Sequence, residues 1–252
     1  MTKQEALFEY LLRIGDNSLI MGHRMGEWCG HGPILEQDIA LINIALDHIG
    51  QATNWLTYAS KIEEKGRTED DLAYKRDVLD FRNLLLCEQP NGNWGDTLVR
   101  GFLFDTWNYY FTKMLTESSN EQVASIATKS LKEISYHKNY SGDWVIRLGD
   151  GTEESHEKMQ HALDTLWMYT GELFKMDEID EMMVKEKIGV DLNLVKNDWD
   201  TTINSVLEEA TLKRPEDKWM QKGGKTGVHT EYLGYILAEM QFLPRAYPDA
   251  KW

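Results

Sequence analysis

The chain has 252 residues, and its 27 Lys and Arg against 42 Asp and Glu give a formal net charge of −15. This charge argues against a nucleic-acid or membrane-surface binder, because either partner requires a basic patch, and no run of Lys or Arg supplies one. No stretch of about 18 apolar residues occurs, and the first ten residues do not resemble a secretory signal. Cys29 and Cys87 form no CxxC pair, which excludes a disulfide framework and a zinc ribbon. We therefore expect a soluble, cytoplasmic protein.

The apolar spacing in the first 60 residues predicts two long helices. In the first, gaps of four and three residues connect Leu7, Leu11, Ile14, Ser18, Met21, Met25 and Trp28. The same gaps recur at Leu35, Ile39, Ile42, Leu46, Ile49, Thr53 and Leu56. Because residues 40–45 are also largely apolar on the opposite face, we expect the second helix to be buried nearly all round.

Three more helical segments follow before residue 150. A shorter helix is expected around Tyr74 to Leu86, and residues 88–93 form a loop by composition. A helix rich in aromatic residues then begins at Asp96 or Thr97 and ends near Leu115. The next helix begins at Asn120 and keeps the same apolar gaps to Gly149.

Four helices of about 25 residues, each with an apolar seam of period 3.5, predict an all-α fold built on a four-helix bundle. Additional C-terminal helices are expected near Ser155–Phe174, Leu192–Ala210 and Val228–Leu243, on the outside or at an end of the bundle. No linker separates a second domain, so residues 1–252 are predicted to form a single domain.

A long four-helix bundle can hold a di-iron carboxylate site, which needs a Glu from each of two helices and a Glu-x-x-His pair from each of the other two. This chain departs from that set on every helix. At the expected inward positions it offers Ser18, Met21 and Met25, then Asp47 followed by Gly50, then Asp105, and finally Glu133 followed by Tyr136, with His137 one position late. We predict no metal ligand.

The polar residues left at these positions, Asp47, Asp105, Glu133 and His137, form a residual polar core in this interpretation. A stripe on the second helix, Asn43, Asp47, Gln51 and Asn54, belongs to the same picture. A hydrogen-bonded network is the favoured interpretation, because buried polar groups need partners. A proton or electron relay is the alternative.

Several motifs taken together resemble the C-subunit family of bacterial phenylacetyl-CoA epoxidases. They lie at residues 12–17, 27–31, 83–86 with 88–93, 223–231 and 237–241. Each motif alone is weak evidence, whereas the combination is specific and extends from about residue 7 to Trp252. The resemblance implies a ferritin-like fold and a non-catalytic role beside a homologous A subunit that carries the di-iron centre. The assembled enzyme epoxidises the ring of phenylacetyl-CoA with O₂ and electrons from a reductase subunit, so no cofactor is expected in this chain.

Two segments are candidates for contact with the substrate. Asp80, Phe81, Arg82 and Asn83 combine a cation, an amide and an aromatic ring before a broken loop, which suits the adenine and phosphates of coenzyme A. Lys225 lies in a Gly-rich loop before a helix N-terminus, where anions are favoured. The resemblance points to the first segment, and to Asp180, Glu181 and Met182 in an acidic turn as a second contact region. No catalytic residue is assigned.

Alternatives to these assignments remain open. Arg82 could be a surface residue paired with a nearby acid, and the loop around Lys225 could be a plain connector. The whole chain could also be a di-iron oxidase or monooxygenase in its own right with an unusual ligand set, or a helical interaction or storage bundle unrelated to acyl-CoA chemistry.

Overall fold

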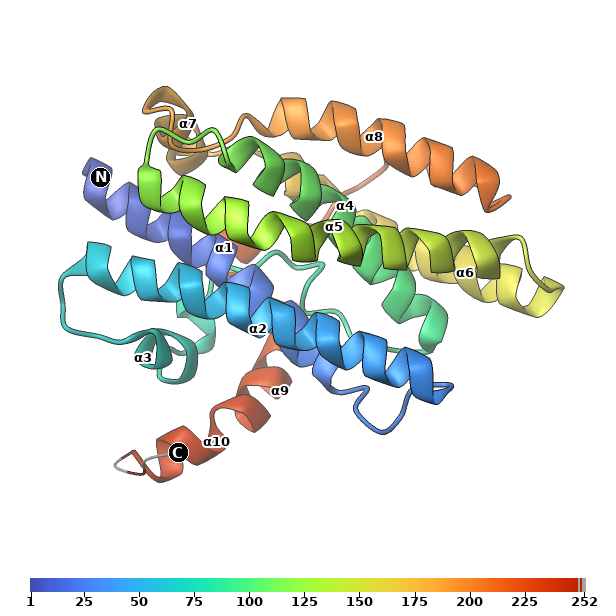
Figure 1. Ribbon diagram of the computed structural model, residues 1–252, viewed down its shortest axis with the longest axis horizontal. Helices are drawn as coiled ribbons and strands as arrows, with labels where there is room; N and C mark the ends of the chain where they lie inside the picture. The colour runs from blue at the N-terminus through green and yellow to red at the C-terminus, as the bar shows by residue number, and fades with distance from the viewer. Residues whose placement is uncertain (249, 251–252) are drawn as a thin grey trace. The chain divides into compact units, whose positions relative to one another are not determined.

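The computed structural model describes residues 1–248 and 250, and all regular structure in these residues is helical (Figure 1). The chain divides into two compact units, which we call unit 1 (Met1–Gln89 with Gly223–Trp252) and unit 2 (Pro90–Lys222). The single domain expected for residues 1–252 stays a prediction. Within the described ranges, no helix is both long and apolar enough to cross a membrane.

Unit 1 is built on two long helices, α1 (Lys3–Gly26) and α2 (Leu35–Glu63), which pack side by side (Figure 1). A capping box fixes the start of α1, where the Thr2 hydroxyl accepts from the Glu5 N–H and the Glu5 carboxylate accepts from the Thr2 N–H. Gly15 and Gly22 allow the close approach of the two helices. A Cβ at either position would lie 2.8 Å from Leu56 or Ile49 of α2.

The apolar register predicted for α1 is confirmed from Leu7 to Met25, although Trp28 lies beyond the helix, whereas the register predicted for α2 is wrong. The buried face of α2 is formed by Leu41, Ile44, Ala45, His48, Gln51, Ala52, Trp55, Leu56 and Ala59. Leu35, Ile39 and Leu46 of the predicted seam are instead 71%, 53% and 63% exposed. Within unit 1, the long helix buried nearly all round is α1, which holds Arg13, Asp16, Asn17 and Arg24 among its buried residues.

The helix predicted around Tyr74 to Leu86 does not form. A short helix, α3 (Glu69–Tyr74), and a 3₁₀ turn, η1 (Val78–Asp80), precede a segment without regular helix. We call residues 81–89 the buried loop, because every residue in it except Arg82 is buried. The apolar run at 84–86 suggested a helix, but the backbone here bonds to side chains of α1 instead, as described below.

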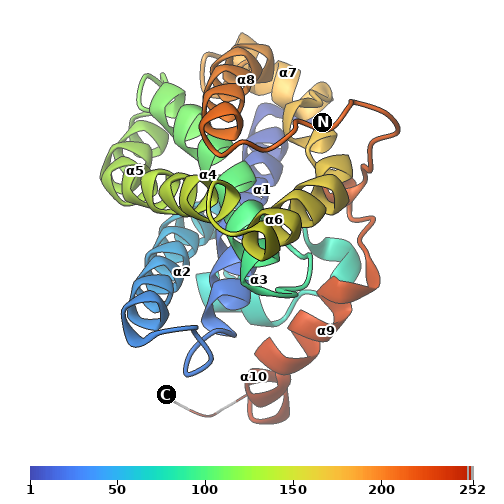
Figure 2. The same cartoon turned by 90° about the vertical axis from the view of Figure 1, so that its right-hand side faces the viewer.

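The C-terminal part of unit 1 begins with a 3₁₀ turn, η4 (Gly224–Thr226). It continues into α9 (Glu231–Met240) and α10 (Phe242–Ala246), which follow one another in Figure 2. The predicted helix over Val228–Leu243 is therefore shorter at its start and broken at Gln241. Gln241 is buried, and its side-chain amide donates to the carbonyls of Ala73 (3.2 Å) and Arg76 (3.0 Å).

Unit 2 is built on α4 (Trp94–Leu115) and α5 (Glu121–Gly149), with α6 (Glu153–Leu166) and α8 (Leu192–Glu209) packed against them. Asn93 and Asn120 cap the first two helices by accepting from backbone N–H groups of the first turn. Buried indoles tie the helices together. Trp199 donates to the Leu103 carbonyl at 3.0 Å, and Trp107 donates to the Leu173 carbonyl at 3.0 Å.

The predicted helix over Ser155–Phe174 is correct only in its first part. After α6 the chain forms two 3₁₀ turns, η2 (Trp167–Tyr169) and η3 (Gly171–Phe174). The acidic turn expected at Asp180–Met182 is wrong, because these residues lie in a helix, α7 (Glu178–Lys185), capped by Asp177. The helix expected at Leu192–Ala210 is confirmed as α8.

Candidate functional site

The backbone of the buried loop needs hydrogen-bond partners from other parts of unit 1. Irregular backbone has no ladder of internal hydrogen bonds, so when it is buried, other groups must satisfy its N–H and C=O groups. Polar side chains on the buried face of α1 provide these hydrogen-bond partners. Their presence in the core of an otherwise apolar helix is explained by the loop that packs on them.

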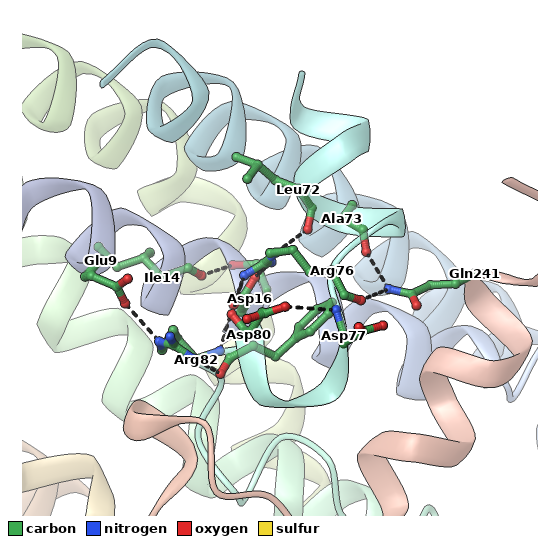
Figure 3. Close-up of polar contacts among 12 residues, drawn as sticks. Glu9, Ile14, Asp16, Leu72, Ala73, Arg76, Asp77, Asp80, Arg82 and Gln241 are labelled. Atoms are coloured by element: carbon green, nitrogen blue, oxygen red, sulfur yellow. Dashed lines mark hydrogen bonds and ion pairs between the residues drawn. The ribbon is translucent and has the colours of Figure 1, made fainter. Parts of the chain in front are cut away.

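Asp16 is the first of these side chains, and Figure 3 shows it at the centre of the contacts. Its carboxylate accepts two bonds from the guanidinium of Arg76, one of them at 2.9 Å, and a third from the N–H of Arg82 at 2.8 Å. Arg76 also donates to the carbonyls of Leu72 and Asp80 and stacks over the Phe81 ring at 4.3 Å. Asp16 and Arg76 are 0% and 3% exposed, so this is a buried ion pair.

Asn17 and Arg24 hold the rest of the buried loop. The Asn17 side-chain oxygen accepts from the Leu84 N–H at 2.7 Å. About two turns further along α1, Arg24 donates two bonds to the Glu88 carbonyl, at 3.2 and 2.7 Å. Three residues of one helix therefore fix three points of the loop.

Glu88 connects the buried loop to the C-terminal part of unit 1. Its carboxylate accepts from the Asn83 amide (3.0 Å) and the Thr230 N–H (2.6 Å), and it contacts Nδ1 of His229 at 2.9 Å. Nε2 of His229 lies 3.0 Å from the Phe81 carbonyl. Both ring nitrogens of His229 therefore face oxygen atoms. The carboxylate thereby fastens residues 229–230 to residues 81–88.

The two candidate substrate segments of unit 1, residues 80–83 and the loop of Lys225, lie in direct contact. Gly224 approaches the Asn83 carbonyl so closely that a Cβ would lie 2.1 Å from its oxygen. Gly227, with φ at +81°, packs against the Leu79 carbonyl in the same way. A glycine is required at each position, because any side chain would separate the two segments. Sequence reasoning had selected both segments without placing them together.

The side chains of residues 80–83 have partners inside the chain. Phe81 and Asn83 are buried, and the carboxylate of the exposed Asp80 accepts from the Asp77 N–H at 3.2 Å. Arg82 is half-buried. It donates through Nε to Glu9 at 2.8 Å and through Nη1 to the carbonyls of Leu79 (2.8 Å) and Phe81 (2.9 Å). Arg82 thus has the acidic neighbour that the alternative interpretation required.

The remaining candidates differ in exposure. Asp180 is buried, and its carboxylate accepts from the Asp177 N–H at 3.2 Å, which completes the capping box of α7. Glu181 is exposed, whereas Met182 and Lys225 are half-buried. The proposed contact of all these residues with substrate stays a prediction.

The residual polar core expected from the sequence is only partly present. Asp105 (2% exposed) and His137 (0%) are buried in unit 2, but Asp47 and Glu133 are half-buried. The positions compared with metal-binding histidines also face outward, because Gly50 is exposed and Tyr136 is 50% exposed. In the polar stripe of α2, Gln51 is buried, Asn43 is exposed and Asn54 is half-buried, so the stripe is not a buried network.

These donors do not fit a di-iron carboxylate centre within either unit. Such a centre needs several inward carboxylates with adjacent imidazoles. In unit 2, Asp105 and His137 supply one of each from the described buried positions of α4 and α5. In unit 1, the buried carboxylates of Asp16 and Glu88 are already bonded to Arg76, His229 and backbone N–H groups.

Asp105 has a perturbed proton affinity. Burial raises the pKa of its carboxyl to about 6, against the opposing influence of His137, the Ser141 hydroxyl and Arg100. The Ser141 hydroxyl donates to Asp105 Oδ2 at 3.0 Å. The folded chain therefore binds a proton here that the unfolded chain releases near its ordinary pKa of 3.8. Folding stability must fall as pH rises through this window, because the folded state then binds more protons than the unfolded one.

We expect Asp105→Asn to remove the fall in folding stability that ionisation of Asp105 causes as the pH rises. At pH 7 the variant should be more stable than the parent by about 1–3 kcal/mol, and at pH 3.5 the two should unfold alike. Urea unfolding measured at both pH values checks this, with Asp143→Asn, at an exposed position of α5, as the control. A variant that is equally destabilised at both pH values would show that the Asp105 carboxylate is stabilising and that the pKa is not raised.

The fold belongs to a recognisable class. The chain is similar to a solved structure, protein 19 with aldehyde deformylating oxidase activity from Synechococcus, with a TM-score of 0.58 over 84% of this chain and 95% of that one. At 13% identity this likeness shows the fold alone. The prediction of an all-α, ferritin-like fold is confirmed.

The chain belongs to the family described as phenylacetic acid catabolic protein, which matches residues 1–252. It is 47% identical over 246 residues to the C subunit of 1,2-phenylacetyl-CoA epoxidase from Escherichia coli (strain K12). The match covers 98% of this chain and 99% of that protein. The resemblance stated from the sequence motifs is confirmed.

Proposed function

We propose that this chain is a non-catalytic subunit of a phenylacetyl-CoA epoxidase, in which it binds and supports a homologous catalytic A subunit. Its similarity to a C subunit along almost its whole length supports a role in a multisubunit enzyme of phenylacetate catabolism. The buried carboxylates and imidazoles described above do not match the ligand set of a di-iron centre, which supports a place beside the metal-binding subunit. An exposed surface of α2 supports the proposed contact with the A subunit.

That surface is an exposed apolar stripe on α2, which we call the α2 stripe: Leu35, Ile39, Ile42, Leu46 and Ile49. Leu35, Ile39 and Leu46 are between 53% and 71% exposed, and the other two are half-buried. Gaps of four and three residues place all five on one line along the helix, the seam geometry by which two long helices pack. An exposed apolar stripe of this kind marks an interaction surface.

We infer that a long helix of the A subunit occupies the α2 stripe. The contact would form part of an obligate interface of more than about 2,000 Å² in total, of the apolar kind found in permanent complexes. This partnership accounts for the misassigned register of α2, because the seam expected from the sequence is a packing seam toward another chain.

A positioning role toward the substrate belongs to the same proposal. Of the eight candidate residues, Asp80, Arg82, Glu181, Met182 and Lys225 have exposed or half-buried side chains. Arg82 and Lys225 are the cations among them, and their segments touch. An effect on binding alone would appear as a higher KM with unchanged kcat. If Arg82→Ala and Lys225→Ala leave KM unchanged in the assembled enzyme, neither side chain contributes to substrate binding.

The proposed function is tested by co-expressing the chain with an A-type subunit. We expect the two chains to purify as one complex that epoxidises phenylacetyl-CoA when a reductase supplies electrons. The chain purified alone should catalyse no epoxidation under the same conditions.

A further inference from the structure

A cavity of about 670 Å³ lies within unit 2, between α6 and the irregular segment 213–220. Its volume is in the range of small-molecule sites, roughly 300–1,000 Å³. None of its lining residues takes part in the function proposed above. They are His156, Gln160, Asp164, Trp167, Met168 and residues 213–216 and 218–220.

The walls of this cavity are fixed in place. The Gln160 side chain brackets the backbone of Lys213, accepting from its N–H at 2.8 Å and donating to its carbonyl at 2.9 Å. The Trp167 indole donates to Asp217 at 2.9 Å, and the Gln221 N–H donates to the Met168 carbonyl at 2.8 Å. A ligand would therefore enter a preformed site, and little ordering entropy would oppose binding.

Arg214 and Trp167 lie at one wall, and the buried Trp199 lies behind them. The guanidinium lies 5.0 Å from the ring of Trp167 and 5.9 Å from that of Trp199. It also donates to Asp200 and Asn204, both at 2.6 Å. Arg214 is thus a structural cation that stiffens the wall, and its charge is balanced by Asp200.

The rim of the cavity carries exposed positive charge. Residues 213–222 contain four cations and two acids, in a chain of net charge −15. Lys213 and Lys218 line the cavity and are exposed. Lys218 lies 3.4 Å from Glu216, but both side chains are about 80% exposed, so water screens this pair. The other acid that lines the cavity is Asp164, and one of its carboxylate oxygens accepts from the Gln160 side chain at 2.9 Å.

An exposed indole completes the site. Trp219 lines the cavity between these lysines and Met220, and 66% of its surface is exposed. A large exposed aromatic side chain in the same pocket as two exposed lysines offers a flat surface for stacking and positive charge for an anion. These are the two requirements for recognising a planar heteroaromatic ring that carries phosphate.

We propose that this cavity binds a nucleotide group, with the base stacked on Trp219 and the phosphates at Lys213 and Lys218. A protein partner fits the same residues less well, because stable protein interfaces are broad surfaces of about 800 Å² per partner, whereas this site is a concave pocket with rigid walls. The nucleotide could be free or could be the end of a larger coenzyme. The shared chemistry is an adenine-type ring with a diphosphate.

Calorimetric titration of the complete chain with ADP tests the proposal. We expect saturable binding with Kd below about 1 mM, and no binding of comparable strength by adenosine or inorganic pyrophosphate, which each lack one of the two groups. Coenzyme A, titrated in parallel, distinguishes the sources, because tighter binding than ADP identifies the larger coenzyme and weaker binding identifies the free nucleotide.

Variants assign the binding to this cavity. Trp219→Ala and Lys213→Ala should each raise Kd for ADP about tenfold. Lys222→Ala is the matched control, because Lys222 is an exposed cation of the same stretch but does not line the cavity. It should change Kd less than about twofold. No saturable ADP binding, or equal weakening by Lys222→Ala and Lys213→Ala, would overturn the proposal, the latter because it indicates general charge attraction. All three side chains are exposed, so none of the variants should impair folding.

Discussion

Asp16→Asn is expected to lower the free energy of unfolding by about 3–5 kcal/mol, the usual consequence of removing one partner from a buried ion pair. The carboxylate is fully buried and compensates the buried guanidinium of Arg76, with which Figure 3 shows it in contact. The neutral amide would leave this cation uncompensated. It would also weaken the bond that fixes the Arg82 N–H. Urea unfolding at pH 7 measures the loss.

The control is Glu154→Gln, which removes an ion pair with Lys158 on the surface of α6. It should leave the unfolding midpoint unchanged, because water screens exposed pairs. A second variant separates charge from packing. In the Asp16→Asn background, Arg76→Met should lower the free energy of unfolding less than it does in the parent chain. The reason is that in this background it removes an uncompensated cation. Strictly additive losses, or an Asp16→Asn loss no larger than the control, would contradict the role given to the ion pair.

Leu46→Asp is expected to weaken binding to the A subunit by about thirtyfold or more, equivalent to about 2 kcal/mol or more. Leu46 is the fourth of the five residues of the α2 stripe and is 63% exposed. A carboxylate there would be buried against an apolar helix without a partner. Because the side chain is exposed in the isolated chain, stability alone should change little. Titration of the purified variant with the A subunit measures the affinity.

Leu194→Asp provides a matched control. Leu194 is a leucine of similar exposure, 54%, on α8 of unit 2, outside the α2 stripe. It should bind the A subunit like the parent chain. Equal effects of the two substitutions, or no effect of Leu46→Asp, would show that the α2 stripe is not the contact surface.

The lengths and limits of the long helices could be predicted from the sequence, because they depend on local signals. Asn120, where a helix was expected to begin, caps α5, whereas α4 begins at Trp94, slightly before the expected start at Asp96 or Thr97, because Asn93 is its cap. The orientation of α2 could not be predicted in this way. Its two faces are both apolar, and periodicity alone does not distinguish a face that packs in its own chain from one that packs on another.

The buried loop was the main failure of the prediction from sequence. The run 84–86 has the composition of a helix, but Asn17 binds the backbone of Leu84 and Arg24 that of Glu88, from 64 or more residues away. Such contacts have no local signature. Polar residues on an otherwise apolar helix, such as Asp16 and Asn17 of α1, were the available signal, because a buried polar side chain implies a partner.

The candidate site was predicted in part. Residues 80–83 and 223–227 were selected separately, and the structure places them in contact. The residues that hold them there, Glu88 and His229, were present in the motifs but were given no role. Their pairing spans 141 positions, so spacing could not suggest it.

The central claim is that this chain supports catalysis by another subunit and performs none itself. The most direct test measures epoxide formed from phenylacetyl-CoA by the A subunit alone, by this chain alone, and by both together, each with the reductase and O₂. We expect no epoxide from this chain alone and turnover by the two together that exceeds the A subunit alone. Epoxide formed by this chain alone, with about two iron atoms bound per chain, would contradict the claim and identify a di-iron oxygenase in its own right.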